Sequence, residues 1–352
     1  MINENVYTQD YIKRMRLEKK CDPVILEKTI FAFGLLEALK KSGADFIFKG
    51  GTSLMLLLEK PQRLSTDIDI IVEPGYDIEA YIRSASEMYP FIHFEENKRT
   101  GANNIVKQHF RFYYKSLKDD DKEVSILLDV LFEKNHYAKV EERELKNELI
   151  ETSGNPIIVK VPSVDSILGD KLTAFAPYTI GVKPVMEKET GEIVDKKTEV
   201  IKQFFDIASL FDVMENIEDV KKSYKKVAIA EIGYRGIDVT IEDCLRDTFN
   251  AAISIFSKGR MFSEMYKEDL LPGIRSLSSF LINVRFNGET AHVQAAKVML
   301  LAACILAGTN IEEIPEGDLF KDEYKSVNLM KKIDKDAFNM AAYAIDIYKS
   351  CE

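Results

Sequence analysis

Hydrophobic and polar residues show two different periodicities in the first half of the chain. Apolar residues recur every three or four positions in residues 22–41, which predicts a packing helix with Asp22 as N-cap and Pro23 at its first position. In several other stretches apolar and polar residues alternate, which predicts strands. These predicted strands cover residues 45–49, 67–70, 91–94, 107–115, 124–133 and 157–161. The mixture of strands and helices predicts an α+β domain.

The helical rhythm dominates from residue 163 onward. Helices are predicted at residues 163–176, 217–232, 241–256, 264–284, 290–307 and 334–348. Residues 177–198 predict a long loop or a small hairpin, and the charged residues 141–151 predict an exposed helix. We therefore expect an N-terminal arm at residues 1–21, an α+β domain at 22–162 and an all-helical domain at 163–352.

Composition limits the class of protein. With 352 residues, 46% of them hydrophobic, the chain can bury a large core. Its net charge of −10 argues against broad nonspecific binding of nucleic acid, but it does not exclude a local basic groove. The four cysteines lie far apart, which predicts free thiols in a reducing cytoplasm. The longest apolar run, residues 298–308, is too short to span a membrane. We expect a cytoplasmic protein with no membrane partner.

Two aspartates alternate with aliphatic residues in the second predicted strand. Asp67 and Asp69 share one face of this strand, while Ile68 and Ile70 share the other. Two carboxylates at this spacing repel each other, and Mg²⁺ relieves such repulsion with carboxylate and phosphate oxygens as ligands. The alternative is a solvated strand end that carries two acids.

A glycine pair precedes these aspartates. Gly50 and Gly51 follow a buried strand and allow the backbone to turn and to approach a ligand closely. Ser53 is a candidate cap for the next helix, and free amides at a helix N-terminus suit a phosphate. A lone glycine pair is usually a turn, but Gly50, Gly51, Thr52 and Ser53 shortly before the aspartates indicate a site for a nucleoside triphosphate.

A third acid lies in the predicted strand at residues 124–133. Asp129 is on the face opposite to Ile126, Leu128 and Val130, in an apolar setting where an unpaired carboxylate is costly. It is a candidate third carboxylate of a two-metal site and a candidate base for an attacking hydroxyl. The alternatives are a bulge and a salt bridge.

The strand at residues 107–115 shows the clearest alternation. Phe110, Phe112 and Tyr114 share one face, and His109, Arg111 and Tyr113 share the other. The polar face either approaches a nucleotide or nucleic acid, or belongs to an edge strand that faces water.

The residues around the glycines and aspartates resemble a known family. They resemble the AbiEii/AbiGii toxin family, which has a nucleotidyltransferase fold of the DNA polymerase β type. The first motif of this family is similar to Lys49-Gly50-Gly51-Thr52-Ser53-Leu54 and Arg63-Leu64-Ser65-Thr66-Asp67-Ile68-Asp69. The second motif is similar to Lys171, Leu172 and Ala174. In a third motif Asp206 matches, whereas Lys202 replaces an arginine and Gln203 replaces an aspartate.

The resemblance implies a mixed sheet flanked by helices, followed by a helical domain. It also implies the activity of a Mg²⁺-dependent nucleotidyltransferase. Asp67, Asp69 and Asp129 would hold Mg²⁺, and Gly50, Gly51, Thr52, Ser53 and Lys171 would hold the nucleoside triphosphate. Arg63 would either neutralise phosphate or brace the carboxylates. Asp206 would orient Lys171 through an ion pair.

The family also implies a toxin of a toxin–antitoxin system, with an antitoxin partner and a tRNA 3′ end as acceptor. Two alternatives stay open. One is nucleotidyl or phosphoryl transfer to a protein hydroxyl, and the other is a non-catalytic nucleotide-binding regulator.

Overall fold

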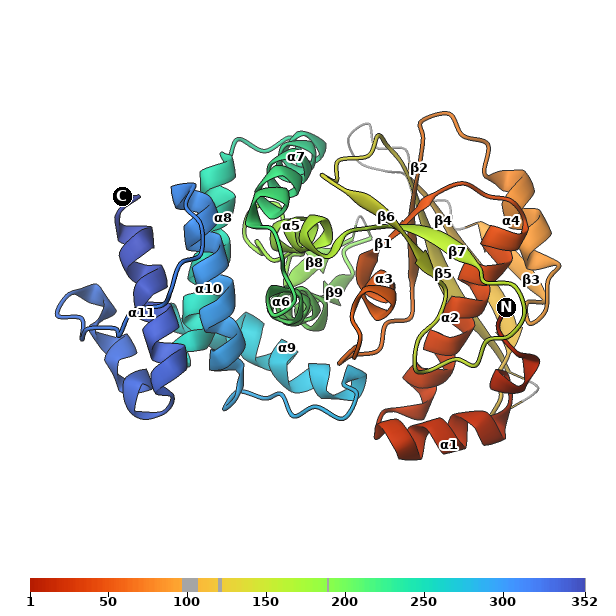
Figure 1. Cartoon of the computed structure of the whole chain (residues 1–352), viewed down its shortest axis with the longest axis horizontal. Coiled ribbons are helices and arrows are strands. Elements are labelled where there is room, and N and C mark those ends of the chain that lie inside the picture. Colours follow the sequence, from red (N-terminus) through yellow and green to blue (C-terminus); the bar gives the residue numbers. More distant parts are fainter. Residues whose placement is uncertain (97–106, 120–121, 189, 352) are drawn as a thin grey trace. The chain divides into compact units, whose positions relative to one another are not determined.

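The chain divides into two compact units. The computed structural model describes residues 1–96, 107–119, 122–188 and 190–351 (Figure 1). One unit consists of Met1–Ser163 and Ser279–Val284, and the other of Val164–Ser278 and Arg285–Glu352. The division falls one residue after the predicted end of the α+β domain at residue 162. No local pattern indicates that residues 279–284 return to the first unit.

A seven-stranded mixed sheet forms the centre of the first unit. Its order is β3-β4-β5-β2-β1-β7-β6, with β2 parallel to β5, β1 parallel to β7 and the other neighbours antiparallel. The strands are β1 (Ile47–Lys49), β2 (Ile68–Val72), β3 (His93–Glu96), β4 (Lys107–Lys115), β5 (Glu123–Phe132), β6 (Val140–Glu144) and β7 (Ile158–Pro162). The predicted mixed sheet is confirmed.

The predicted helix at residues 141–151 is wrong, because β6 occupies its first part and pairs with β7. Arg143 Nη2 lies 2.7 Å from Glu141 Oε1. Residues two apart share one face of a strand but not of a helix, so this ion pair suits the strand. The charges also suit the edge position of β6, because charged edge strands resist pairing with other chains.

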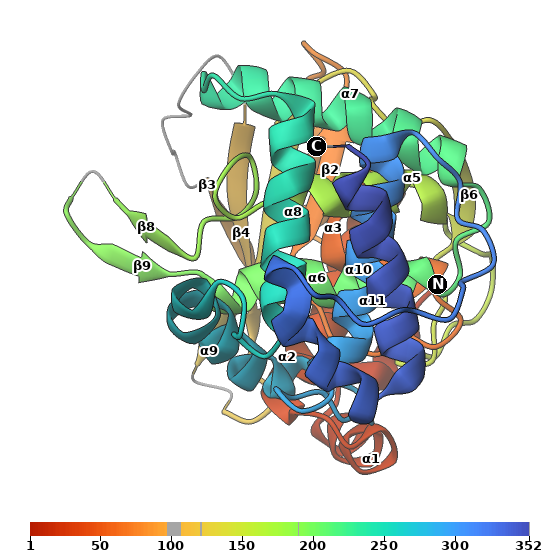
Figure 2. The same cartoon turned by 90° about the vertical axis from the view of Figure 1, so that its left-hand side faces the viewer.

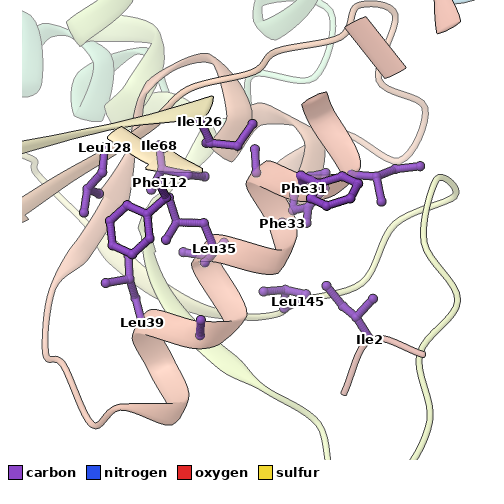
Figure 3. Close-up of a cluster of buried hydrophobic side chains, with 14 of the residues drawn as sticks. Ile2, Phe31, Phe33, Leu35, Leu39, Ile68, Phe112, Ile126, Leu128 and Leu145 are labelled. Atoms are coloured by element: carbon purple, nitrogen blue, oxygen red, sulfur yellow. The ribbon is translucent and has the colours of Figure 1, made fainter. Parts of the chain in front are cut away.

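Helix α2 (Pro23–Lys41) forms the core of the first unit with the sheet (Figures 1 and 3). Its N-cap is Asp22, as predicted, and the Asp22 carboxylate accepts hydrogen bonds from the amides of Val24 (2.8 Å) and Ile25 (3.0 Å). Figure 3 shows side chains of α2 and the sheet in one cluster. The labelled members from these elements are Phe31, Phe33, Leu35, Leu39, Ile68, Phe112, Ile126 and Leu128.

The predicted N-terminal arm belongs to this core. Helix α1 (Gln9–Lys19) buries Tyr11, Ile12 and Met15, so residues 1–21 are part of the first unit rather than a separate arm. Two further helices, α3 (Gly50–Leu57) and α4 (Glu79–Ser86), complete this unit.

The second unit is mainly helical (Figure 2). Its α-helices are α5 (Val164–Ala174), α6 (Lys197–Phe211), α7 (Ile217–Arg235), α8 (Ile241–Phe256), α9 (Leu271–Ser276), α10 (Ala291–Ala307) and α11 (Lys335–Lys349). Strands β8 (Val185–Glu187) and β9 (Ile193–Asp195) form a hairpin that extends from these helices, so the domain is not all-helical. Among the helices that the structure describes, none has the length and apolar character needed to cross a membrane.

The predicted helix at residues 264–284 is interrupted. A π-helical segment (Met265–Leu270) leads into α9, and a 3₁₀ turn (Leu277–Phe280) follows it. Pro272 lies in the middle of the predicted helix and has no amide hydrogen to donate, which opposes a continuous helix. The chain then forms a short bridge from Leu281 to Arg63 in the first unit.

The cap of α2 provides a test of this fold. Replacing Asp22 by alanine removes both hydrogen bonds to the first turn, and we expect a loss of about 1 kcal/mol in the free energy of unfolding. Asp22→Asn keeps an acceptor and should retain most of the stability. Urea unfolding followed by circular dichroism measures the difference, and an alanine variant as stable as wild type would contradict the prediction.

Candidate functional site

Four polar residues form a row across four neighbouring strands. In the register of the sheet, His109 on β4 lies opposite Asp129 on β5, Asp129 lies opposite Asp69 on β2, and Asp69 lies opposite Lys49 on β1. The next residues along the strands are buried, among them Phe48, Ile70, Leu128 and Phe110. Because side chains alternate between the faces of a sheet, the row lies on the face opposite to the α2 core.

The Asp69 carboxylate lies against the first residue of α3. A Cβ atom added to Gly50 would be 2.0 Å from Asp69 Oδ2 and 2.8 Å from its carboxyl carbon, and the φ angle of Gly50 is +78°. Glycine is therefore required at this position for both conformation and space. The contact brings one predicted metal ligand directly to the N-terminus of a helix, where amides without helical partners favour negative charge.

Arg63 lies against the second glycine. A Cβ at Gly51 would be 2.6 Å from Arg63 Nη2 and 2.8 Å from Ser65 Oγ. The guanidinium is buried, and its Nη1 donates to the carbonyl oxygen of Leu64 at 3.0 Å. The main chain beside Arg63 is held by residues 279–284, since the Leu64 amide donates to the carbonyl oxygen of Phe280 at 2.7 Å. These contacts place Arg63 against the glycine turn.

The hydroxyls of Thr52 and Ser53 are buried and bound to main-chain oxygens. Thr52 Oγ1 donates to the carbonyl oxygen of Asp67 at 2.6 Å, and Ser53 Oγ donates to that of Gly50 at 2.9 Å. The prediction that Ser53 caps the helix is wrong, because α3 begins at Gly50 and Lys49 is its N-cap. The Thr52 bond joins the start of α3 to the start of β2, so it fixes the glycine turn relative to the aspartate strand.

Asp67 lies one residue before β2 and is exposed. Its carboxylate accepts a hydrogen bond from Thr66 Oγ1 at 3.3 Å. Asp129 is half-exposed and in register with Asp69, and its Oδ1 lies 2.6 Å from His109 Nδ1. One predicted alternative for Asp129 was a salt bridge, and the contact with His109 takes its place as a side-chain hydrogen bond. This contact coexists with the position of Asp129 beside Asp69.

These residues fit a hard divalent cation. Two carboxylates on adjacent strands offer oxygen ligands, and Mg²⁺ commonly takes one or two carboxylates and completes its shell with water and substrate phosphate. Within residues 1–96, 107–119, 122–188 and 190–351, no three histidine, cysteine, aspartate or glutamate side chains already form a metal-binding cluster. The predicted site with three carboxylates and Mg²⁺ therefore stays a prediction.

The other predicted site residues lie in the second unit. Lys171 on α5 and Asp206 on α6 are both buried, and Lys171 Nζ lies 3.0 Å from Asp206 Oδ2. The same ammonium donates to Gln203 Oε1 at 2.9 Å. The structure thus contains the predicted ion pair. It also shows that Gln203, which replaces an aspartate of the family motif, keeps a hydrogen bond to the lysine without adding charge.

Two features of the site were not predicted. The hydrogen bond from His109 to Asp129 depends on the pairing of β4 with β5, although the alternation in residues 107–115 had placed His109 on the polar face. The support of the Arg63 segment by residues 279–284 depends on a contact between distant parts of the sequence. The contacting residues Phe280, Leu281 and Ile282 lie in a stretch predicted as helix, and no local pattern there identifies such a contact.

Gly50 provides a test of the glycine turn. In Gly50→Ala the positive φ angle costs about 1–2 kcal/mol, and the new methyl group also displaces the Asp69 carboxylate. Gly75→Ala is a matched control, because Gly75 has φ +84° but nothing within 4 Å of an added Cβ. Urea unfolding should show a larger loss for Gly50→Ala than for Gly75→Ala, and equal losses would refute the close contact with Asp69.

The buried ion pair provides a second test. Replacing Lys171 by methionine leaves Asp206 buried without its cation, and we expect a loss of about 3–5 kcal/mol in the free energy of unfolding. Lys188→Met breaks an exposed pair with Glu192 in the same unit and should cost less than about 1 kcal/mol. Chemical denaturation compares the two variants, and similar losses would show that the Lys171 pair contributes no more than a surface pair.

A comparison with known protein families matches residues 34–277 to the family described as "Nucleotidyl transferase AbiEii toxin, Type IV TA system". This match covers more than half of the chain and includes the row of polar residues as well as Lys171 and Asp206. A search of curated proteins finds no match. The resemblance suggested by the sequence motifs is confirmed, and the chain belongs to the AbiEii nucleotidyl transferase toxin family.

Proposed function

We propose that this protein transfers a nucleoside monophosphate from a nucleoside triphosphate to the 3′ hydroxyl of tRNA, with Mg²⁺ as cofactor. The observation that carries the proposal is the in-register pair of Asp69 and Asp129 beside the N-terminus of α3. Membership of a nucleotidyl transferase toxin family supports the reaction class, and the toxin–antitoxin description supports an antitoxin as partner.

The first unit supplies groups for both halves of this reaction. Asp67, Asp69 and Asp129 would hold Mg²⁺, which neutralises charge on the transferred phosphate. The hydroxyls of Thr52 and Ser53 already donate to main-chain oxygens. The triphosphate would therefore be held by the backbone amides of Gly50, Gly51, Thr52 and Ser53 rather than by these hydroxyls. Arg63 would brace this turn from its position against Gly51.

The proposed transfer is a single displacement at the α-phosphorus. The acceptor hydroxyl oxygen forms a bond to the α-phosphorus, the bond from that phosphorus to the pyrophosphate oxygen breaks, and pyrophosphate leaves. Asp129 accepts the proton of the attacking hydroxyl. Lys171, oriented by Asp206, is proposed to bind the triphosphate as a point charge.

The proposed function is tested with purified protein, Mg²⁺, total tRNA and each α-labelled nucleoside triphosphate in turn. We expect label in tRNA, and Asp69→Asn should lower the rate about 100-fold or more, because a lost cation ligand removes several kcal/mol of transition-state stabilisation. Asp45→Asn is a matched control, since Asp45 is an exposed acid of the same unit paired with Lys160. Omission of Mg²⁺ should abolish transfer in all variants.

The outcomes separate the alternatives. Label on protein instead of tRNA would replace the proposed acceptor by a protein hydroxyl. A parallel reaction with γ-labelled nucleoside triphosphate detects phosphoryl transfer, which would transfer the γ label but not the α label. Nucleotide binding without transfer to either acceptor would favour a regulator that binds nucleotide without turnover. Equal rates for Asp69→Asn and Asp45→Asn would show that Asp69 is not part of the reaction centre.

A further inference from the structure

His109 is the end of the polar row, and neither the family motifs nor the predicted site included it. Its side chain is 17% exposed, whereas that of Asp129 is 44% exposed. A carboxylate only accepts hydrogen bonds, so the imidazole Nδ1–H is the donor in the 2.6 Å contact with Asp129 Oδ1. The bond therefore connects a largely buried ring to a carboxylate that is open to solvent on one side.

The other histidines show what distinguishes this pair. Each of the four histidines in the chain lies near a carboxylate, at 2.9 Å for His93, 3.6 Å for His136 and 3.5 Å for His292. Their partners are Glu123, Glu133 and Asp334, none of which is a predicted site residue. The contact of His109 is shorter than these three, and its partner is in register with Asp69.

The bond has a consequence for the geometry of the site. An aspartate that is half-exposed can rotate about two side-chain bonds, and fixing it on cation binding costs conformational entropy. The His109 hydrogen bond restrains this rotation beforehand and leaves Oδ2 as a ligand. Residues that orient metal ligands in this way typically change metal affinity or activity 10–100-fold when they are replaced.

We propose that His109 is a positioning residue, which holds the Asp129 carboxylate in the orientation that binds the divalent cation beside Asp69. The inference rests on the proposed function, because it concerns the same centre. His109 acts through Asp129 and takes no part in bond formation. The alternation along β4 explains how it reaches this place, since Phe110 and Phe112 are buried in the core and His109 lies on the opposite face of the strand.

The test measures Mn²⁺ affinity of the full chain by electron paramagnetic resonance, without nucleotide. His109→Leu should weaken Mn²⁺ binding about 10–100-fold. His109→Asn places an amide N–H near the position of Nδ1 and should restore most of the affinity. His93→Leu is a matched control, because it removes a strand histidine from another carboxylate, Glu123, and should leave Mn²⁺ binding unchanged.

A double-mutant cycle separates positioning from a general effect on folding. If His109 acts through Asp129, His109→Leu should have little effect on Mn²⁺ affinity in an Asp129→Asn background, because the group that it orients is already altered. Wild-type affinity in His109→Leu, failure of His109→Asn to restore binding, or equal effects in both backgrounds would each overturn the proposal. Nucleotide transfer is measured in parallel, so absence of transfer by wild type would contradict the proposed function while the Mn²⁺ series still decides the role of His109.

Discussion

The constraint on which the site depends is the placement of two carboxylates on adjacent parallel strands. Asp69 and Asp129 are in register, and neighbouring strands are about 4.8 Å apart. Two negative charges at such a distance repel each other by on the order of 3 kcal/mol at the effective dielectric of a protein surface. The fold can offset this repulsion by placing hydrogen-bond donors or cations next to the two carboxylates. His109 and Lys49 occupy the two ends of the row, and the N-terminus of α3 lies against Asp69.

The glycine turn is a second consequence of the same placement. Because the Asp69 carboxylate points at the start of α3, no side chain fits at Gly50, and the Arg63 guanidinium fills the space beside Gly51. The hydroxyl of Thr52 then joins this helix to the main chain of Asp67. These contacts explain why glycines, a threonine, an arginine and the aspartates occur together in one short stretch. Together these contacts hold the glycine turn in place, with the N-terminus of α3 against the Asp69 carboxylate.

Local sequence patterns were sufficient for most of the elements but not for their pairing. The cap at Asp22 and the alternation in β4 were predicted because they depend on residues close in sequence. The register of Asp129 with Asp69 was not predictable, because a strand carries no local signal for its partner or its alignment. The strand β6 was mistaken for a helix for the same reason, since its partner β7 determines its conformation. His109 was correctly placed on a polar face, yet its partner Asp129 became evident only from the sheet.

In the second unit, a negative charge is likewise compensated by a neighbouring cation, here in a buried pair. Lys171 and Asp206 together carry no net charge, and each is shielded from water. An aspartate at the partly buried position 203 would place a second negative charge beside the same ammonium, and charge is costly to remove from water. Gln203 accepts a hydrogen bond from Lys171 and donates one to the carbonyl oxygen of Glu199, so it satisfies the same neighbourhood while remaining neutral. Gln203 therefore binds the Lys171 ammonium beside Asp206 without adding a negative charge.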